Sequence, residues 1–526
     1  MDMFPTVETW QLRKSAVQSE AGIVVSQNYM ASDVGAKVLA EGGNAVDAAI
    51  ATSFAISTVE PWMSGLGGGG YMQIYLAKEN RVETIDFGMV SPSGLDPERY
   101  KLVEGTDSDL FSWPSVSGEI NVMGPHSIAV PGQVAGMALS LERFGTRDWQ
   151  TLIAPAIKLA EEGLAVDWYA TLKIASNASE LALYPEAAKT YLPQGFAPAA
   201  DWTSPLPKIQ LGNLHATLTR LSSAGYTDFY SGKIAEDIVE DMQSLGSTIT
   251  LDDLSKYRAR VVDPLTINYR DSVIHAADGL TAGPTLDHAL EVLGDTMNPQ
   301  VSTESERYVA YANALRVAYD QRLASIGHAA RPTSTTHLSV VDTEGNLVAL
   351  TQTLLSVFGS RVVLPKTGVL MNNGIMWFDP RSSKPNSIAP GARPLCNMCP
   401  VIVQTGEGYQ YAMGASGGRR IMPAVMQLIS SVCDFGADID TAMHSPRIDY
   451  SGTGRVTANN LLSGATISVL QDQFEVDVVV DSVYPSYFAC PNVAGRGTAL
   501  GTNFGSAFIN SPWAKASIGS ALSKTG

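Results

Sequence analysis

The hydrophobic positions near the start of the chain follow two successive helical patterns. Between residues 31 and 43, apolar side chains recur every three or four positions, as on one face of a helix, and Gly42 and Gly43 end the pattern. Asn44 is a typical helix N-cap, and the stretch that follows it is apolar on nearly every face until Pro61. The sequence therefore predicts two helices, the second of which lies in the interior of the fold.

A run of four glycines, Gly67 to Gly70, follows these helices and leads into residues 71–76, YMQIYL, which read as a strand. Consecutive glycines expose backbone N–H groups that can hold a phosphate, but a phosphate loop also needs a Lys-Ser/Thr pair and a helix after it. Both are missing here. We therefore predict a tight, close-packed crossing of the backbone at this point.

The pattern changes again further along the chain. Between residues 130 and 270, polar loops alternate with stretches that are charged on one face and apolar on the other, which predicts exposed amphipathic helices that act as scaffold. From Thr336 onward, short β-branched runs separated by turn signals predict a sheet. The predicted strands of this sheet cover residues 336–342, 346–354, 360–365 and 369–372.

Composition narrows the class of protein. The chain has 526 residues, of which 45% are hydrophobic and 17% charged, a balance that is typical of a soluble globular protein with a large core. Length alone leaves open whether there are roughly two to four domains or one large layered unit. The net charge is −17 and no Lys/Arg cluster is present, so nucleic acid is not an expected partner.

The sequence shows neither an apolar export signal in its first thirty residues nor an apolar run of about 18 residues that could cross a membrane. We therefore expect a cytoplasmic protein. Its four cysteines lie in the last quarter of the chain, too few and too local for a disulfide framework. Cys396 and Cys399 form a C-x-x-C pair, but no second ligand pair is found at matching spacing, so buried reduced thiols are expected and no metal or cofactor.

Hydroxyl residues crowd the entry to the first predicted strand, at Ser334, Thr335 and Thr336. A threonine hydroxyl needs a base, which its own α-amino group, with a pKa near 7.7 to 8.0, can supply once that amine is free. Attack of the Thr335 hydroxyl on the Ser334 carbonyl would divide the chain into residues 1–334 and 335–526, the second with 526 − 334 = 192 residues. Alternatively, these residues are simply compatible with the start of a strand.

Several motifs in one order support the first interpretation, and with them the chain resembles the γ-glutamyltransferase family nearly end to end. The resemblance implies an α+β fold of the N-terminal-nucleophile type, a four-layered αββα sandwich, in which the large piece 1–334 and the small piece 335–526 form one folded unit. It also implies an inactive precursor that cleaves itself before Thr335. The motifs are EGGNAVDAAIA (41–51), SGLGGGGYM (64–72), AVPGQVAG (129–136), TTHLSVVDTEGNLVALTQTL (335–354), LMNNG (370–374), RPLCNMCP (393–400) and GASGGRRI (414–421).

The same resemblance implies roles for three further residues. Thr353 would be the second threonine, which hydrogen-bonds the nucleophile Thr335. Gly417 and Gly418 would donate backbone N–H groups to the oxyanion of the tetrahedral intermediate, where each such donor is worth about 2.7–4 kcal/mol. The alternative for the two glycines is a plain turn.

The sequence departs from the family where glutathione-processing members hold the γ-glutamyl group. Gly88 replaces an arginine that binds the α-carboxylate, Leu355 and Trp377 replace an asparagine and an aspartate that bind the amino group, and Cys396 and Asn397 replace two serines. Only Asn397 keeps comparable hydrogen-bonding capacity. Because each lost charge-assisted contact costs about 1.5–3 kcal/mol, glutathione is not the expected substrate.

The variant segments resemble a side branch of the family that contains cephalosporin or glutaryl acylases and an oxamate amidohydrolase of urate breakdown. If Trp377 narrows the pocket, a small substrate is favoured, so we predict hydrolysis of oxamate to oxalate and ammonia. Arg361, Arg419 and Arg420 are candidates to bind the substrate carboxylate, although each could equally be structural. The alternatives are an acylase, a γ-glutamyl hydrolase or transpeptidase acting on glutathione, and a non-catalytic binding protein on the same fold.

The expected partners are the small amide substrate and the two fragments of the precursor, and a homodimer of processed heterodimers is compatible with the sequence. A pocket-covering loop is expected, if anywhere, in residues 378–394, which are rich in proline and serine.

Overall fold

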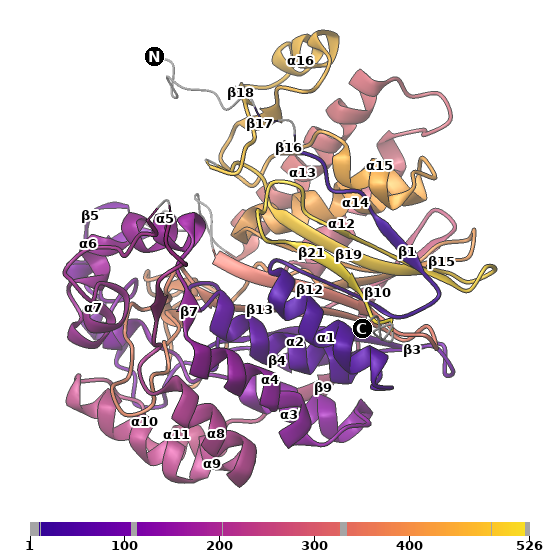
Figure 1. Cartoon of the computed structure of the whole chain (residues 1–526). Helices are drawn as coiled ribbons and strands as arrows, with labels where there is room; N and C mark the ends of the chain where they lie inside the picture. The colour runs from indigo at the N-terminus through magenta and orange to yellow at the C-terminus, as the bar shows by residue number, and fades with distance from the viewer. Residues whose placement is uncertain are drawn as a thin grey trace.

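Two antiparallel sheets lie face to face in the computed structural model, which describes residues 10, 12–106, 113–201, 203–326, 334–484 and 486–520 (Figure 1). The first sheet has the order β1 (Val17–Ser19), β20 (Thr502–Ala507), β19 (Cys490–Gly497), β15 (Tyr409–Ser416), β14 (Val401–Gln404), β11 (Ser272–Ala276), β10 (Leu265–Tyr269). The second has the order β21 (Lys515–Ile518), β2 (Ile23–Ser26), β12 (Ser334–Val341), β13 (Leu347–Leu355), β3 (Gly69–Leu76), β4 (Arg81–Phe87), β9 (Arg260–Val262).

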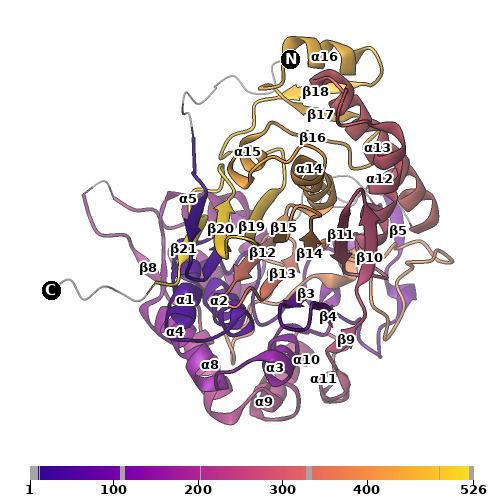
Figure 2. The ribbon, with the colours of Figure 1, turned by 90° about the vertical axis from the view of Figure 1, so that its right-hand side faces the viewer.

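Helices cover the outer face of each sheet, as Figure 2 shows. On the second sheet lie α1 (Tyr29–Ala40), α2 (Ala45–Val59) and α3 (Gln133–Phe144), with α4 (Trp149–Glu162) packed on α2. On the first sheet lie α12 (Gly283–Thr296), α14 (Ile421–Cys433) and α15 (Ile439–His444), with α13 (Glu304–Ile326) packed on α12. This arrangement confirms the predicted αββα layers, and each sheet contains strands from both sides of the predicted cut.

Smaller elements surround the sandwich. Near α4 lie the helices α5 (Trp168–Ser176), α6 (Ala178–Leu181), α7 (Pro185–Tyr191), α8 (Leu214–Ala224), α9 (Thr227–Ser231), α10 (Lys233–Ser244) and α11 (Leu251–Lys256). Beyond α13 lie α16 (Gly464–Gln471) and a small sheet of β16 (Ile448–Asp449), β17 (Val456–Asn459) and β18 (Val476–Val479). Two further sheets have two strands each: β5 (Leu102–Thr106) pairs with β6 (Pro114–Val116), and β7 (Leu164–Ala165) pairs with β8 (Lys208–Ile209).

The second predicted helix is interior, as its composition indicated. Asn44 and Asp47 form a reciprocal capping box at its start, and every residue of α2 is buried. The helix contacts β12 and β13 directly. It therefore supports the two strands that carry the residues of the candidate site.

The glycine run is a close backbone crossing, as predicted. A Cβ on Gly68 would lie 2.4 Å from the carbonyl oxygen of Thr353, and one on Gly70 would lie 2.2 Å from that of Thr351. No side chain fits at either distance, so these glycines let β3 pair closely with β13.

The strand predictions were right for β12 and β13 and wrong further on. Residues 360–365 and 369–372 contribute only two isolated bridges, one between Val363 and Leu370 and one between Met371 and Gly67. Phe358 and Arg361 have φ values of 61° and 64°, which lie in the left-handed region. These two residues therefore break the extended backbone at the start of the predicted strand 360–365. The amphipathic helices α4 and α10 are confirmed, and no helix in the described ranges is long and apolar enough to span a bilayer.

Candidate active site

The start of β12 meets the end of β13 at an irregularity in their pairing. Ser334 pairs with Leu355 and Thr336 pairs with Gln352, so the single residue Thr335 stands opposite two residues of β13, Thr353 and Leu354. This is a β-bulge, a feature that is common next to active sites because it re-aims a side chain. It frees Thr335 from regular pairing at the peptide bond where cleavage is predicted.

The two threonines of the predicted pair are in contact. Thr335 Oγ1 lies 3.4 Å from Thr353 Oγ1, and both side chains are buried. The backbone N–H of Leu355 donates to Thr353 Oγ1 at 2.8 Å and so fixes the orientation of that hydroxyl. The residues assigned as nucleophile and partner therefore come together as the sequence indicated.

Leu355 adopts a strained backbone conformation to make this contact. Its φ of 86° is rare for a residue with a branched side chain. Asn373 stabilises this turn. Its side-chain Oδ1 accepts from the N–H of Ser356 at 3.0 Å, and its backbone N–H donates to the carbonyl of Leu354 at 3.1 Å. Asn372 likewise donates to the carbonyls of Gly67 and Ala129. The Asn-Asn pair thus holds the backbone around Thr353.

The glycine turn follows β15 directly. Gly417 has a φ of 133° and Gly418 a φ of 62°, conformations that favour glycine. A Cβ on Gly417 would also lie 2.9 Å from Cα of Ala489. Both the backbone angles and the close approach therefore require glycine here, which leaves the N–H groups of this turn uncovered by any side chain of their own.

The glycine turn and the threonine pair lie at the same end of the sandwich. Val401 at the start of β14 pairs with Met413 near the end of β15, so the residues just before β14 lie beside the glycine turn. One of them, Cys396, belongs to the same buried apolar cluster as Leu355. Gly414 on β15, three residues before Gly417, also packs against His337 on β12, two residues after Thr335.

The positions that bind the γ-glutamyl head in the resembled family form an apolar surface in this chain. Leu355, Trp377 and Cys396 are all buried in one cluster, together with Tyr71. At Gly88, a Cβ would lie 3.2 Å from the Tyr71 hydroxyl and 3.3 Å from Nη1 of Arg393, which leaves no room for a long side chain. This surface offers no charged group at the replaced positions.

The arginines proposed for a substrate carboxylate are engaged elsewhere. Nε and Nη2 of Arg361 both lie 2.6 Å from a carboxylate oxygen of Glu180 on α6, which neutralises its charge. The Arg419 guanidinium lies 5.5 Å from the Tyr319 ring centroid, and burial lowers its pKa to about 10. Arg420 donates to the carbonyl of Ser486 at 3.4 Å. Arg419 alone of the three is buried beside the glycine turn.

A different arginine, Arg322 on α13, contacts the loop before β14, and sequence reasoning missed it. Its Nη2 donates to the carbonyl of Cys396 at 2.8 Å and to Oδ1 of Asn397 at 3.2 Å, and burial lowers its pKa. Among the described residues, Nδ2 of Asn397 is buried and has no hydrogen-bond partner. In the sequence, Arg322 stands three residues after Tyr319 on one face of a helix. This arrangement matches no motif, so sequence reasoning had no ground to single it out.

His337 of the Thr-Thr-His motif lies buried at the interface between the two sheets. Its ring nitrogens hydrogen-bond the hydroxyls of Thr351 and Ser339, each at 2.9 Å, and burial lowers its pKa to about 3. It is therefore neutral at physiological pH. Burial also raises the pKa of Cys396 and of Cys399 to about 12, so both thiols are protonated at neutral pH.

The segment proposed as a covering loop is anchored next to the apolar cluster. Asn386 donates from Nδ2 to the carbonyl of Trp377 at 2.7 Å and accepts from the N–H of Leu395 at 2.9 Å. Asp379 is fully buried and binds Arg381. Residues 378–394 are thus tied at both ends to segments that border the site.

Comparison with known proteins adds three findings. The family model described as Gamma-glutamyltranspeptidase matches residues 31–331 and 324–483. The Acylase ACY 1 proenzyme of Pseudomonas sp. strain SE83 is 30% identical over 487 residues, which cover 85% of this chain and 86% of the relative. The Glutathione hydrolase proenzyme of Escherichia coli strain K12 is 29% identical over 496 residues, 82% of each chain.

Among solved structures, a cephalosporin acylase from Bacillus halodurans is similar over 98% of this chain and 99% of its own, with a TM-score of 0.81 and 21% identity. At that identity the likeness bears on the fold alone. It extends across both sheets and both helical layers.

Proposed function

Because the chain belongs to the gamma-glutamyltranspeptidase family, we propose that it is a self-processing amide hydrolase in which Thr335 is the nucleophile and Thr353 its hydroxyl partner. The contact between these two hydroxyls at the β-bulge is the observation that supports this assignment most directly. Similar chains are named as proenzymes, which agrees with a precursor that must be cut before it acts.

In the proposed self-cleavage, Oγ1 of Thr335 attacks the carbonyl carbon of Ser334, and the Ser334–Thr335 amide becomes an ester with a free α-amine. Water then hydrolyses the ester, which leaves residues 1–334 and a small piece that begins with Thr335. The strained turn at Leu355 holds Thr353 in place for this step.

In the proposed hydrolysis, the α-amine of Thr335 takes the proton of its own hydroxyl, and Oγ1 attacks the substrate amide carbonyl. Gly417 and Gly418 donate N–H groups to the oxyanion. The leaving nitrogen takes the proton and departs as ammonia or an amine, and water releases the acid from the acyl-threonine. Each step uses only groups of this chain, the substrate and water.

The apolar cluster at Leu355, Trp377 and Cys396 argues against a γ-glutamyl substrate, since these positions carry no charge for a zwitterionic head and the nearby Arg393 is paired with Asp86. A polar group at this border is the amide of Asn397, whose Oδ1 accepts from Arg322 and whose Nδ2 has no partner among the described residues. This amide suits a compact acyl group that ends in a carboxylate. We therefore propose oxamate as substrate, which would yield oxalate and ammonia and would place the protein in urate nitrogen catabolism.

An N-acyl amine is the second candidate substrate. The 30% identity to the Acylase ACY 1 proenzyme over most of both chains supports it, and so does the apolar surface at the border of the site. The two candidates differ in the size of the acyl group, which a comparison of substrates can separate.

The experiment measures the turnover of three amides by the purified, processed protein: ammonia from oxamate, p-nitroaniline from glutaryl-p-nitroanilide, and p-nitroaniline from γ-glutamyl-p-nitroanilide with and without glycylglycine. We expect oxamate to give the highest kcat/KM and the γ-glutamyl compound the lowest. Preference for the glutaryl amide would establish the acylase alternative.

Two other results would count against the proposal. Fast γ-glutamyl turnover would refute the argument from the apolar cluster. A processed protein that hydrolyses none of the three amides would favour a binding protein that keeps the fold. The Thr335→Ala variant is the control and should be inactive on all three.

A further inference from the structure

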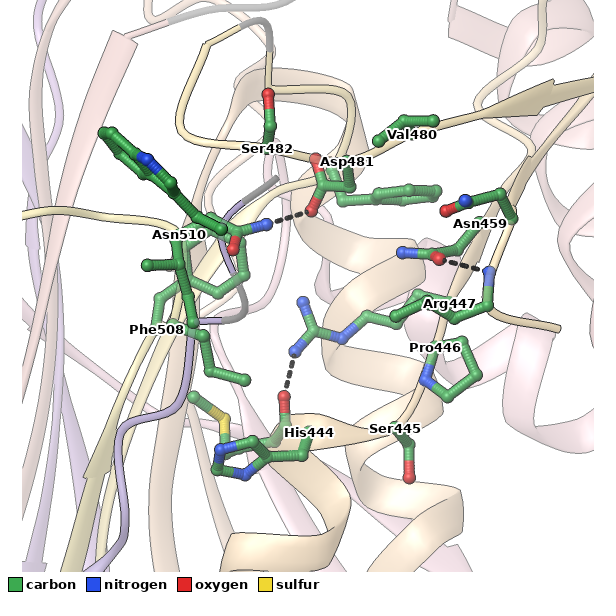
Figure 3. Close-up of a pocket in the computed structure, with 17 residues that line it drawn as sticks. His444, Ser445, Pro446, Arg447, Asn459, Val480, Asp481, Ser482, Phe508 and Asn510 are labelled. Carbon is green, nitrogen blue, oxygen red and sulfur yellow. Dashed lines mark hydrogen bonds between the residues drawn. The ribbon is translucent and has the colours of Figure 1, made fainter. Parts of the chain in front are cut away.

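A cavity of about 470 Å³ lies outside the candidate active site, between α15, the small sheet and the loops that follow β18 and β20 (Figure 3). A volume of this size is typical of small-ligand pockets. The residues assigned to catalysis or substrate binding do not line it. Its lining instead combines one buried cation with polar and aromatic side chains.

Arg447 is the cation, and its guanidinium points toward the middle of the cavity in Figure 3. Only 5% of the residue is exposed. Its Nη2 donates to the carbonyl of Met443 at 3.1 Å, and its Cζ lies 5.5 Å from the Phe508 ring centroid. Burial lowers the pKa of this guanidinium.

The carboxylate in the same cavity is occupied by other donors. Asp481 Oδ1 accepts from the N–H of Tyr487 at 3.0 Å, and Oδ2 accepts from Nδ2 of Asn510 at 2.7 Å. Among the described residues, no carboxylate lies within ion-pair distance of Arg447, and no hydrogen bond engages its Nε or Nη1. A buried guanidinium without a partner anion is costly, so these N–H groups suit an incoming carboxylate.

His444 adds a second unused polar atom. Its Nδ1 donates to the carbonyl of Asp440 at 2.7 Å, so in the neutral ring Nε2 carries the lone pair. That Nε2 is buried and has no partner within the described ranges. The remaining lining is mixed, with apolar side chains such as Trp10, Phe488 and Leu461 and polar ones such as Asn459 and Asn460. The cavity therefore places a buried cation beside apolar side chains.

We propose that this cavity is a second ligand site, which binds a small carboxylic acid with an apolar body, its carboxylate held by Arg447. An aromatic or branched aliphatic body would pack against Phe488 and Phe508, and a hydroxyl or amine on it would donate to His444. A free inorganic anion would use the guanidinium but leave the apolar walls uncovered, so it should bind more weakly.

Isothermal titration calorimetry with sodium phenylacetate tests this proposal on the full-length protein. We expect saturable binding that falls by roughly tenfold or more in Arg447→Met, because charge-assisted hydrogen bonds are lost. Benzyl alcohol, which has the same ring and no charge, and inorganic phosphate should both bind wild-type protein at least roughly tenfold more weakly than phenylacetate.

Two further variants keep the test decisive if Arg447→Met is unstable. Leu461 is 73% exposed, so Leu461→Asp should leave the fold intact while placing a negative charge at the rim, and it should weaken phenylacetate binding. Arg13→Met is the matched control, because Arg13 pairs with Asp440 nearby but does not line the cavity, and it should bind as wild type does. Equal affinity in wild type, Arg447→Met and Leu461→Asp, or no saturable binding to wild type, would overturn the proposal.

Discussion

Thr335 and Thr353 are 18 positions apart in the sequence, and the pairing of two neighbouring strands is what brings their hydroxyls together. The bulge matters as much as the pairing, because it sets one residue of β12 against two of β13. The N–H of Leu355 fixes the Thr353 hydroxyl, and the positive φ values of Gly417 and Gly418 shape the turn whose N–H groups we propose as donors to the oxyanion.

Asn397 provides a prediction about recognition. Replacing it by alanine removes the buried Nδ2 that has no partner among the described residues, without touching the threonines or the glycine turn. If Nδ2 contacts the substrate, Asn397→Ala should raise KM by about tenfold, the effect of one hydrogen bond to a charged group, with kcat largely unchanged. Steady-state kinetics on the preferred amide checks this, and a variant that lowers kcat at constant KM would contradict it.

His337 provides a prediction about pH. Its pKa is about 3 in the fold and near 6.5 when unfolded, so below pH 6.5 protons bind the unfolded chain preferentially. The free energy of unfolding should therefore fall by up to about 1.4 kcal/mol per pH unit from this one group as pH drops from 6.5 toward 3, and it should not change through this group above 6.5.

Urea unfolding at several pH values measures this dependence, in a Thr335→Ala background that keeps the chain in one piece. His337→Gln in the same background is the control and should show a shallower decline below pH 6.5. Identical slopes for the two proteins would mean that the buried imidazole does not titrate as described.

Sequence motifs supplied candidates for the chemistry more readily than for recognition. Thr335, Thr353 and the glycine pair stand in motifs, so they could be proposed without coordinates, and the contact between the two threonine hydroxyls agrees with the proposal. Arg322 could not, because its relevance depends on α13 packing against the loop before β14. The ion pair of Arg361 with Glu180 could not be foreseen either, because nothing in the sequence shows that the two lie side by side.

At the scale of elements, the close approach of β12 and β15 depends on a missing side chain. Gly414 on β15 faces His337 on β12, and a Cβ there would lie 2.3 Å from Cε1 of the imidazole. The two sheets can therefore reach their spacing only with glycine at this position. The predicted strands at 360–372 failed for a related reason: β-branched composition favours strands, but the left-handed turn at residues 358–361 interrupts them.

Gly414→Ala should for this reason lower the free energy of unfolding by about 1–3 kcal/mol, the cost of forcing an extra methyl group into a packed interior. Gly464→Ala is the matched control, since nothing lies within 4 Å of the Cβ it would add. Denaturant midpoints of the two variants in the single-chain background provide the comparison. If the midpoints coincide, the sheets are less tightly packed at His337 than the structure indicates.

At the scale of the whole molecule, each sheet contains strands from both sides of the predicted cut. In the second sheet, β21, β12 and β13 come from the small piece and β2, β3, β4 and β9 from the large piece, and β2 lies between β21 and β12, so strands of the two pieces are interleaved. The first sheet likewise joins β14 to β11 and β20 to β1. Both pieces therefore share their cores, and neither has a complete sheet of its own.

It follows that cleavage should not separate the pieces. The processed protein should migrate as one particle in native size-exclusion chromatography and should separate into residues 1–334 and 335–526 only in denaturant. Dissociation under native conditions would contradict the interleaved sheets. The sequence left the number of domains open because shared sheets are visible only once the strand order is known.

The most direct test of the account is intact mass spectrometry of the purified wild-type protein and of Thr335→Ala. We predict two masses for wild type, which add up to the full chain plus one water and meet between Ser334 and Thr335, and a single uncut mass for the variant. An uncut wild-type protein, a cut at another bond, or cleavage that persists in Thr335→Ala would contradict the claim that Thr335 cuts the chain and becomes its nucleophile.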